Sequence, residues 1–125
     1  MFQKIACTII LILSVAFASF TTEASDTIDA FIEEVRTPSY DCPSQSLFPQ
    51  LEKTLLGESL STQQRFALTV AKGQFLICRG KYEEAEKMLL KAIMQSNIDE
   101  TSYAFASAIY QIGFSYDARE NPARC

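Results

Sequence analysis

Cysteine has the widest chemical range of the residues in this chain, because it can act as a nucleophile, bind a metal or form a disulfide. The chain has four cysteines, Cys7, Cys42, Cys78 and Cys125, and no histidine among its 125 residues. No two cysteines have CxxC spacing, so the sequence does not support a thioredoxin-like redox centre or a zinc cluster. Without histidine, Ser-His-Asp and Cys-His catalysis and His-bearing zinc or haem sites are excluded. We expect no metal and no cofactor.

The carboxylates of Glu83, Glu84 and Glu86 are a second group that could serve as a catalytic or metal-binding set. Successive residues on a helix point in different directions, so these carboxylates do not converge, and Glu83 with Lys87 is an ordinary i, i+4 pair. A solvated helix face is therefore the favoured interpretation. No nucleophile, base and orienting group can be assembled from the residues present. We expect a chain that is not an enzyme and has no catalytic residue.

The charge of the chain argues against nucleic acid as a partner. Eleven Lys and Arg residues stand against fifteen Asp and Glu residues, which gives a net charge of −4 at pH 7. The basic residues are scattered among acids, whereas phosphate neutralisation needs clustered Lys and Arg. The glycines are isolated, so no loop can cradle a phosphate. Binding of other proteins and assembly remain as function classes.

Residues 1–24 have the pattern of an export signal. Lys4 precedes residues 5–20, sixteen residues without a charge that are rich in Ile, Leu, Val and Ala. Small residues precede two candidate cleavage points, after Ala18 and after Ala24, and we favour the second because a polar stretch then separates it from the apolar run. The alternative is an uncleaved membrane anchor, for which the run is short. The sequence predicts an exported chain.

Cleavage would remove Cys7 and leave three cysteines in an oxidising compartment. Three cysteines cannot all form disulfides within one chain, so we expect one disulfide and one unpaired cysteine. We predict a disulfide between Cys42 and Cys78. The alternative is that Cys78 is a small buried side chain in an apolar helix.

Beyond residue 24 the sequence predicts helices throughout. Apolar residues recur at i, i+3, i+4 and i+7 in the first helix, and Ser61 with Gln64 has the spacing of a capping box. Gly80 is free to take a positive φ in a tight connection. Asn121 and Pro122 have the pattern of one more helix start. The expected helices are 27–36, 46–56, 61–78, 82–95 and 101–119, and the second of them could also begin directly after the turn at 41–44.

The apolar residues of these helices predict which faces are buried. In the second helix they are Leu47, Phe48, Leu51 and Leu55. In the fourth helix they are Tyr82, Ala85, Leu89, Ala92 and Ile93. The fifth helix is apolar on nearly all sides, so we expect it to be covered from more than one direction.

The chain contains an internal repeat. Gly73-x-x-Leu76 recurs as Gly113-x-x-Tyr116, a period of 40 residues from Gly73 to Gly113. The first copy resembles a tetratricopeptide repeat at the small and large positions of that motif, which are Gly73, Leu76, Gly80, Tyr82, Ala85, Leu89 and Ala92. Thr69, Lys72 and Asn97 depart from the motif.

The resemblance implies an all-α fold in which antiparallel helix pairs stack as a short right-handed solenoid. It divides the chain into a signal at 1–24, leading capping helices at 25–60, a repeat at 61–98 and the first helix of an incomplete second repeat at 99–125. About three such repeats are generally needed for stability. We therefore expect a piece of a longer solenoid whose fifth helix lacks its natural cover.

In such solenoids the first helix of each unit lines a concave face, where a protein or peptide partner usually lies. Carried over position by position, the resemblance places eight residues on this concave face. Ala67 and Val70 are two of them, and the other six are the candidate binding residues Gln74, Ile77, Ser107, Tyr110, Phe114 and Asp117. The alternative for Tyr110 and Phe114 is packing beneath an adjacent helix. The partner would be another protein, a peptide, or the remaining repeats of a longer chain.

Three short segments behind the export signal are similar to the exported sensory region of bacterial GGDEF signalling proteins. They are Asp41-Cys42-Pro43-Ser44, Ile77-Cys78-Arg79-Gly80 and Tyr110-Gln111-Ile112-Gly113-Phe114. This similarity implies a periplasmic input region that precedes a membrane span and a diguanylate cyclase domain, so any cyclase activity would belong to sequence not present here. Contact with the membrane would come only from the signal segment or from that absent sequence. The alternative is a free-standing periplasmic or secreted adaptor.

Overall fold

The computed structural model describes residues 26–36, 41–95 and 97–120. The expected signal segment 1–24, the helix start at Asn121 and Cys125 lie outside these residues. The chain divides into two units, Met1–Phe31 and Ile32–Cys125. Within the first unit residues 26–31 are helical, and this helix ends at residue 35 in the second unit.

The described residues form helices and no strands, which confirms the predicted all-α class for that part of the chain. A short 3-10 turn, η1, leads directly into the first labelled helix of the second unit. None of the helices in the described ranges is long and apolar enough to cross a bilayer. The elements after the helix at 26–35 are η1 Gln45–Leu47, α2 Phe48–Leu55, α3 Thr62–Cys78, α4 Tyr82–Ile93 and α5 Tyr103–Glu120.

Local sequence signals set both ends of α3. Ser61 Oγ accepts a hydrogen bond from the backbone N–H of Gln64, and the side chain of Gln64 accepts one from the N–H of Ser61, so the predicted capping box is confirmed. At the other end Gly80 has a φ of 76°, as predicted for the tight connection to α4. The expected helix 82–95 stops earlier, at Ile93, and Asn97 then turns the chain with a φ of 70°.

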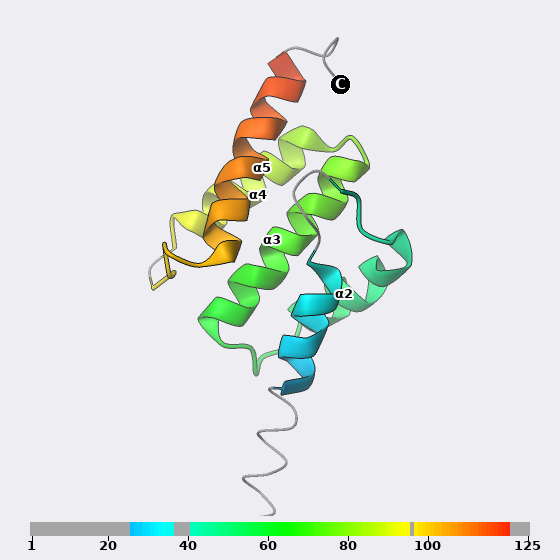
Figure 1. The fold of residues 1–125 in the computed structure, drawn as a ribbon, viewed down its shortest axis with the longest axis vertical. Coiled ribbons are helices and arrows are strands. Elements are labelled where there is room, and N and C mark those ends of the chain that lie inside the picture. The colour runs from blue at the N-terminus through cyan, green and yellow to red at the C-terminus, as the bar shows by residue number, and fades with distance from the viewer. Residues whose placement is uncertain (1–25, 37–40, 96, 121–125) are drawn as a thin grey trace, which may run out of the picture. The chain divides into compact units, whose positions relative to one another are not determined.

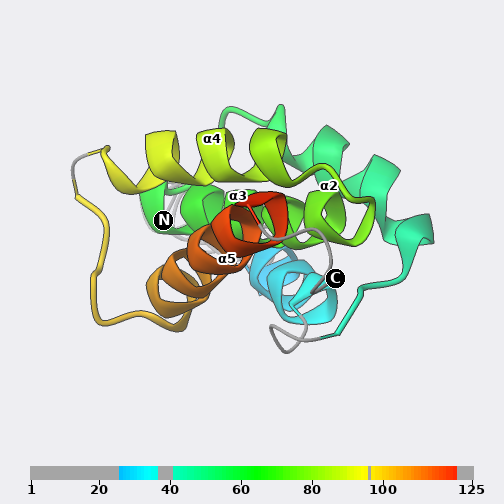
Figure 2. The same cartoon turned by 90° about the horizontal axis from the view of Figure 1, so that it is seen from above.

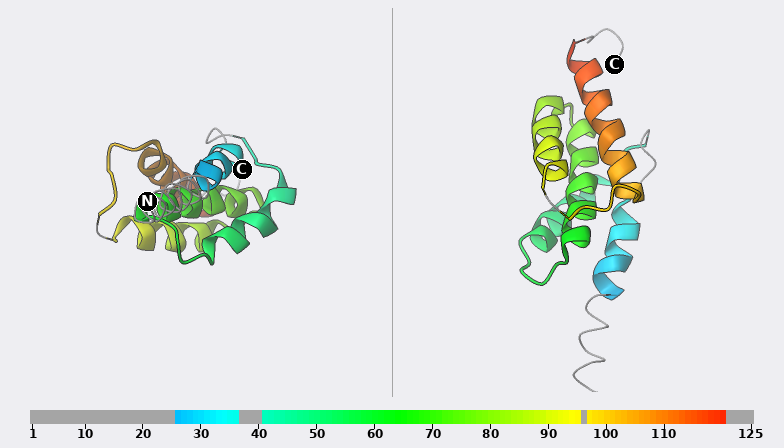
Figure 3. Two further views of the ribbon diagram at one scale, coloured as in Figure 1. Left: turned by 90° about the horizontal axis from the view of Figure 1, so that it is seen from below. Right: turned by 90° about the vertical axis from the view of Figure 1, so that its left-hand side faces the viewer.

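Helices α3, α4 and α5 contact one another pairwise and form the centre of the second unit (Figures 1 and 2). The short connection at Gly80 makes α4 antiparallel to α3, and α5 then runs in the direction of α3 (Figure 1). Figure 3 shows the same three helices side by side from a direction at right angles to the first.

The core of the second unit lies where these three helices meet. One cluster of buried side chains joins Phe66 and Val70 of α3, Leu89 and Ala92 of α4, and Ala108 of α5. A second cluster, towards the end of α3, contains Leu76, Ile77 and Ala85. The predicted inner face of α4 is therefore confirmed at its three central positions, Ala85, Leu89 and Ala92.

Helix α2 is fastened to α3 by one buried leucine, an arginine and a disulfide. Leu51 is fully buried, while Leu47, Phe48 and Leu55 are only half-buried, so the predicted inner face is too wide. Among the described helices α2 packs mainly against α3. The guanidinium of Arg65 in α3 donates hydrogen bonds to the carbonyls of Leu55 and Gly57, at 2.7 and 2.6 Å.

The disulfide joins Cys42, which precedes η1, to Cys78 at the end of α3, with their Cα atoms 5.8 Å apart. Beside it the guanidinium of Arg79 lies 3.9 Å from the centre of the Phe48 ring and donates to the amide oxygen of Gln45 at 2.7 Å. These contacts hold the segment before α2 against the end of α3.

Candidate functional site

A small cavity lies in the second unit between residues 32–36, α3 and α5. Its volume is about 60 Å³. This gives room for a few water molecules, whereas pockets for small organic ligands measure roughly 300–1,000 Å³. The cavity therefore cannot enclose a peptide or a cofactor in its present form.

Two glutamine side chains at this cavity join parts of the chain that are far apart in the sequence. Nε2 of Gln111 donates to the Val70 carbonyl at 3.2 Å and to Ser107 Oγ at 3.1 Å, which links α5 to α3. The Gln111 side chain is buried, and its Oε1 accepts no hydrogen bond among the described residues. Nε2 of Gln74 donates to the Asp41 carbonyl at 2.6 Å. Both amides therefore serve the fold.

Arg36 and Tyr103 also line the cavity, and both side chains are exposed. The guanidinium of Arg36 lies 4.6 Å from the centre of the Tyr103 ring, within the range of a cation–π contact. The same guanidinium forms an ion pair of 2.7 Å with Glu33. The positive charge of Arg36 is thus already paired.

The predicted concave-face residues fall into three groups. Gln74 and Ser107 line the cavity, together with Ala67 and Val70. Ile77 is buried in the cluster with Leu76 and Ala85. The remaining three, Tyr110, Phe114 and Asp117, are exposed on α5.

Tyr110 and Phe114 form a stacked pair on the surface. Their ring centres are 6.4 Å apart, and the side chains are 50% and 41% exposed. The ring of Tyr82 at the start of α4 meets Phe114 edge-on at 6.2 Å. Among the described residues no helix covers this pair. The exposed rings of Tyr110 and Phe114 and the half-buried ring of Tyr82 together form an aromatic surface that spans α4 and α5.

A second exposed stripe of α5 was not among the predicted site residues. Ile109 and Tyr116 are 48% and 55% exposed, and Gly113 lies between them. A Cβ placed on Gly113 would meet no atom within 4 Å. The 40-residue repeat is the sequence feature that points to this surface. It aligns Gly113 and Tyr116 with Gly73 and Leu76, which are buried in the first copy.

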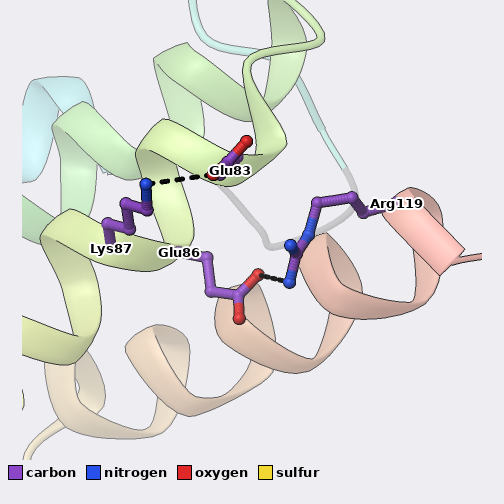
Figure 4. A network of polar contacts seen from close by, with 4 residues as sticks. All are labelled: Glu83, Glu86, Lys87 and Arg119. Atoms are coloured by element: carbon purple, nitrogen blue, oxygen red, sulfur yellow. Dashed lines mark hydrogen bonds and ion pairs between the residues drawn. The ribbon is translucent and has the colours of Figure 1, made fainter.

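The acidic residues of α4 form two separate ion pairs (Figure 4). Glu83 pairs with Lys87 on the same helix at 3.0 Å, and the hydrogen bond from Lys87 lowers the pKa of the Glu83 carboxyl. Glu86 reaches across to Arg119 of α5 at 2.8 Å. The carboxylates thus point to different partners. In the part of the chain that the structure describes, no three His, Cys, Asp or Glu residues are grouped to hold a metal ion.

Comparison of the chain with protein-family models, with curated proteins and with solved structures finds no match. The function must therefore be argued from the surfaces of the molecule. Two surfaces stand out. One is the aromatic surface of Tyr82 on α4 with Tyr110 and Phe114 on α5, and the other is the stripe of Ile109, Gly113 and Tyr116 on α5.

Proposed function

We propose that this chain is a non-catalytic helical-repeat module that binds another protein or a peptide. The observation that carries the proposal is the exposed stacked pair of Tyr110 and Phe114, with Tyr82 against it. Aromatic rings bury much area at a small entropy cost and are enriched where proteins bind one another. Asp117, one turn after Phe114, adds a carboxylate beside the rings.

We also propose that α3 and α4 form one tetratricopeptide-like pair and that α5 is the first helix of the next pair. The opposite directions of α3 and α4 and the common direction of α3 and α5 support this arrangement. A further support is that two arginines 40 residues apart make equivalent contacts. The guanidinium of Arg79, at the end of α3, lies over the Phe48 ring of α2, and Arg119 of α5 binds Glu86 of α4, so each arginine contacts the helix that precedes its own.

Photo-crosslinking in the exporting cell tests the binding function. The crosslinking amino acid p-benzoylphenylalanine would replace Tyr110 in one version of the chain and Glu52, which is exposed on α2, in another. We expect a specific adduct from position 110 that is lost when Phe114→Ser is added, and no such adduct from position 52. Equal labelling from both positions, or an adduct that ignores Phe114→Ser, would contradict the proposal.

The setting we propose is the bacterial periplasm, with the chain as the input region of a membrane signalling protein of GGDEF type. Support comes from the signal pattern of residues 1–24 and from the three similar segments. The Cys42–Cys78 disulfide fits an oxidising compartment. Mass spectrometry of the exported product tests the location, because cleavage after Ala24 leaves Ser25 as the first residue.

A free-standing adaptor is the second candidate, and the exposed face of α5 favours it because a separate chain can cover that face. The coding sequence that follows Cys125 separates the two candidates. A further repeat and then about 20 apolar residues would support the signalling protein. An immediate stop codon would favour the free-standing adaptor over the signalling protein.

A further inference from the structure

We propose that the cavity between residues 32–36, α3 and α5 binds a short-chain aliphatic carboxylate, with about two or three carbon atoms beyond the carboxyl group. Two hydrogen-bond donors that line the cavity, the guanidinium of Arg36 and the hydroxyl of Ser107, hold the carboxylate. The alkyl tail occupies the apolar part of the cavity. The residues of the aromatic surface do not line it, so this is a small-molecule site in addition to the proposed protein-binding surface.

Most of the cavity wall is apolar. These side chains cannot donate or accept a hydrogen bond, and their contact with an alkyl group removes apolar surface of both from water. An alkyl tail is therefore the kind of group that the wall favours. The apolar lining residues are Ile32, Val35, Ala67, Val70, Ala71 and Ala104.

The volume of the cavity sets the length of the tail. It measures about 60 Å³, whereas a cavity of about 150 Å³ holds benzene, with its six carbon atoms. At the same volume for each atom, roughly 25 Å³, this cavity encloses about two or three carbon atoms. The carboxylate then lies at the side where Arg36 and Tyr103 are exposed. Propionate and butyrate fit this description, while the tail of octanoate is too long.

Ser107 provides a hydrogen-bond donor at the cavity wall. It is 8% exposed, and its Oγ accepts a hydrogen bond from Nε2 of Gln111 at 3.1 Å. The hydroxyl hydrogen itself has no acceptor among the described residues, so it is left to donate to an oxygen in the cavity. A carboxylate oxygen is a stronger acceptor for this hydrogen than a neutral oxygen.

Arg36 provides the charge that selects an anion. Among the described residues that line the cavity, it is the one with a charged side chain. Its guanidinium lies 4.6 Å from the ring centre of Tyr103, which precedes Ser107 by one turn of α5, so the charge and the hydroxyl lie on the same side of this helix. The ion pair with Glu33 is exposed and uses one of five N–H donors, so others remain for a ligand.

An NMR titration of the full chain with sodium butyrate tests the site, with the side-chain amide of Gln111 as the reporter. We expect saturable shifts with butyrate and propionate. Binding of 1-butanol, which has a similar tail without the carboxylate, should be at least tenfold weaker, and octanoate should not shift this amide. Arg36→Gln should weaken butyrate binding at least tenfold. Lys53→Gln, which removes a positive charge from the exposed surface of α2, should leave it unchanged.

Two variants of the wall test the other contacts. Ser107→Ala should weaken butyrate binding by about three- to tenfold, because it removes the second donor and leaves the apolar wall in place. Ala67→Leu should abolish binding of butyrate and of 1-butanol alike, because the larger side chain fills part of the cavity. Ala67 is only half-buried, and the unfolding midpoint checks that the variant folds. If it does not fold, the comparison of Arg36→Gln with Lys53→Gln still decides.

Each other outcome overturns the proposal. Absence of saturable binding by both acids excludes the site. Equal binding of butyrate and 1-butanol would mean that the cavity does not select a carboxylate, and equal binding of octanoate would mean that its volume does not limit the tail. Equal weakening by Arg36→Gln and Lys53→Gln would mean a general effect of charge. The crosslinking test at Tyr110 probes a different surface, so failure here leaves the protein-binding function standing.

Discussion

The amide oxygen of Gln111 lies against the backbone of Gly73, at a point where a Cβ on the glycine would be only 2.5 Å from that oxygen. The amide cannot swing away freely, because its Nε2 is hydrogen-bonded to the Val70 carbonyl and to Ser107 Oγ. Leu89 lies on the same glycine from α4. Gly73 is therefore the point at which the backbone of α3 touches side chains of both other core helices.

The two glycines of the repeat should respond to alanine in opposite directions. Gly73→Ala should lower the free energy of unfolding by about 1–3 kcal/mol, because the methyl group overpacks the contact with Gln111 and Leu89. Gly113→Ala should raise it by up to about 1 kcal/mol, since alanine is the better helix former and nothing fills the space. Urea denaturation of both variants measures the two changes, and equal shifts would contradict the packing described here.

The features that the sequence predicted well are local. The capping box of Ser61 and Gln64 and the positive φ of Gly80 each depend on residues within one turn of chain, so residue type and spacing were sufficient. The 40-residue repeat, which aligns α3 with α5, stays a prediction. The helix ends were less certain, and α4 stops two residues before the expected Gln95.

The site residues were harder to predict because their roles depend on contacts between distant parts of the chain. Gln111 bonds to Val70, 41 residues away, and nothing in its type shows that it is buried. Gln74 was a candidate for the binding face and instead supports the Asp41 segment. Ile109 and Ile77 are the same residue type, yet one is exposed and one buried, because α5 has no neighbour on its outer side among the described residues.

Removal of the hydroxyl of Ser115 should stabilise the chain. Ser115 is fully buried in α5, and its Oγ has no hydrogen-bond partner among the described residues. Ser115→Ala removes an unsatisfied polar group and introduces a better helix former, so we expect a gain of about 1 kcal/mol in the free energy of unfolding. Thermal and urea unfolding would measure it. A loss of stability would mean that the hydroxyl has a partner.

The disulfide between Cys42 and Cys78 should contribute about 2–4 kcal/mol to stability, because it closes a long loop, with 36 residues of separation, in the unfolded chain. The double variant Cys42→Ser/Cys78→Ser should unfold at a correspondingly lower urea concentration. A reductant should lower the midpoint of the parent chain and leave the double variant unchanged. The denatured, unreduced chain that starts at Ser25 should have one free thiol, and three would exclude the bridge.

Asp99 should make stability depend on pH in the acid range. Hydrogen bonds from the side chain and the backbone N–H of Thr101 lower the pKa of the Asp99 carboxyl below its ordinary value of 3.8. A lowered pKa means that the charged form is favoured in the folded state, so this stabilisation is present above about pH 4 and is lost as the pH falls through the folded-state pKa.

The variant Asp99→Asn isolates this contribution. The difference in unfolding midpoint between the parent chain and Asp99→Asn should be constant from about pH 7 to pH 5 and should shrink below about pH 4. The carboxyl of Glu83, whose pKa is lowered by Lys87, titrates in both proteins and cancels in the difference. A difference that grows as the pH falls would contradict the predicted sign.

The ion pair between Glu86 and Arg119 joins α4 to α5, and a double-mutant cycle should detect it. The Glu86 side chain is only 15% exposed and that of Arg119 is 38% exposed, so solvent screens the pair incompletely. We expect a coupling free energy of about 0.5–1 kcal/mol from Glu86→Gln and Arg119→Gln, alone and together. The cycle through Glu83 and Lys87, both well exposed, should give a smaller coupling.

The salt dependence of the two cycles tells the pairs apart. Raising the salt concentration towards 1 M shortens the screening distance to about 3 Å, so the exposed Glu83–Lys87 coupling should vanish while part of the Glu86–Arg119 coupling remains. Arg119→Lys should keep the charge but lose the stacking on Tyr116, so it should retain only part of the coupling with Glu86. A Glu86–Arg119 coupling near zero at low salt would mean that Arg119 does not bind Glu86 across the helix contact.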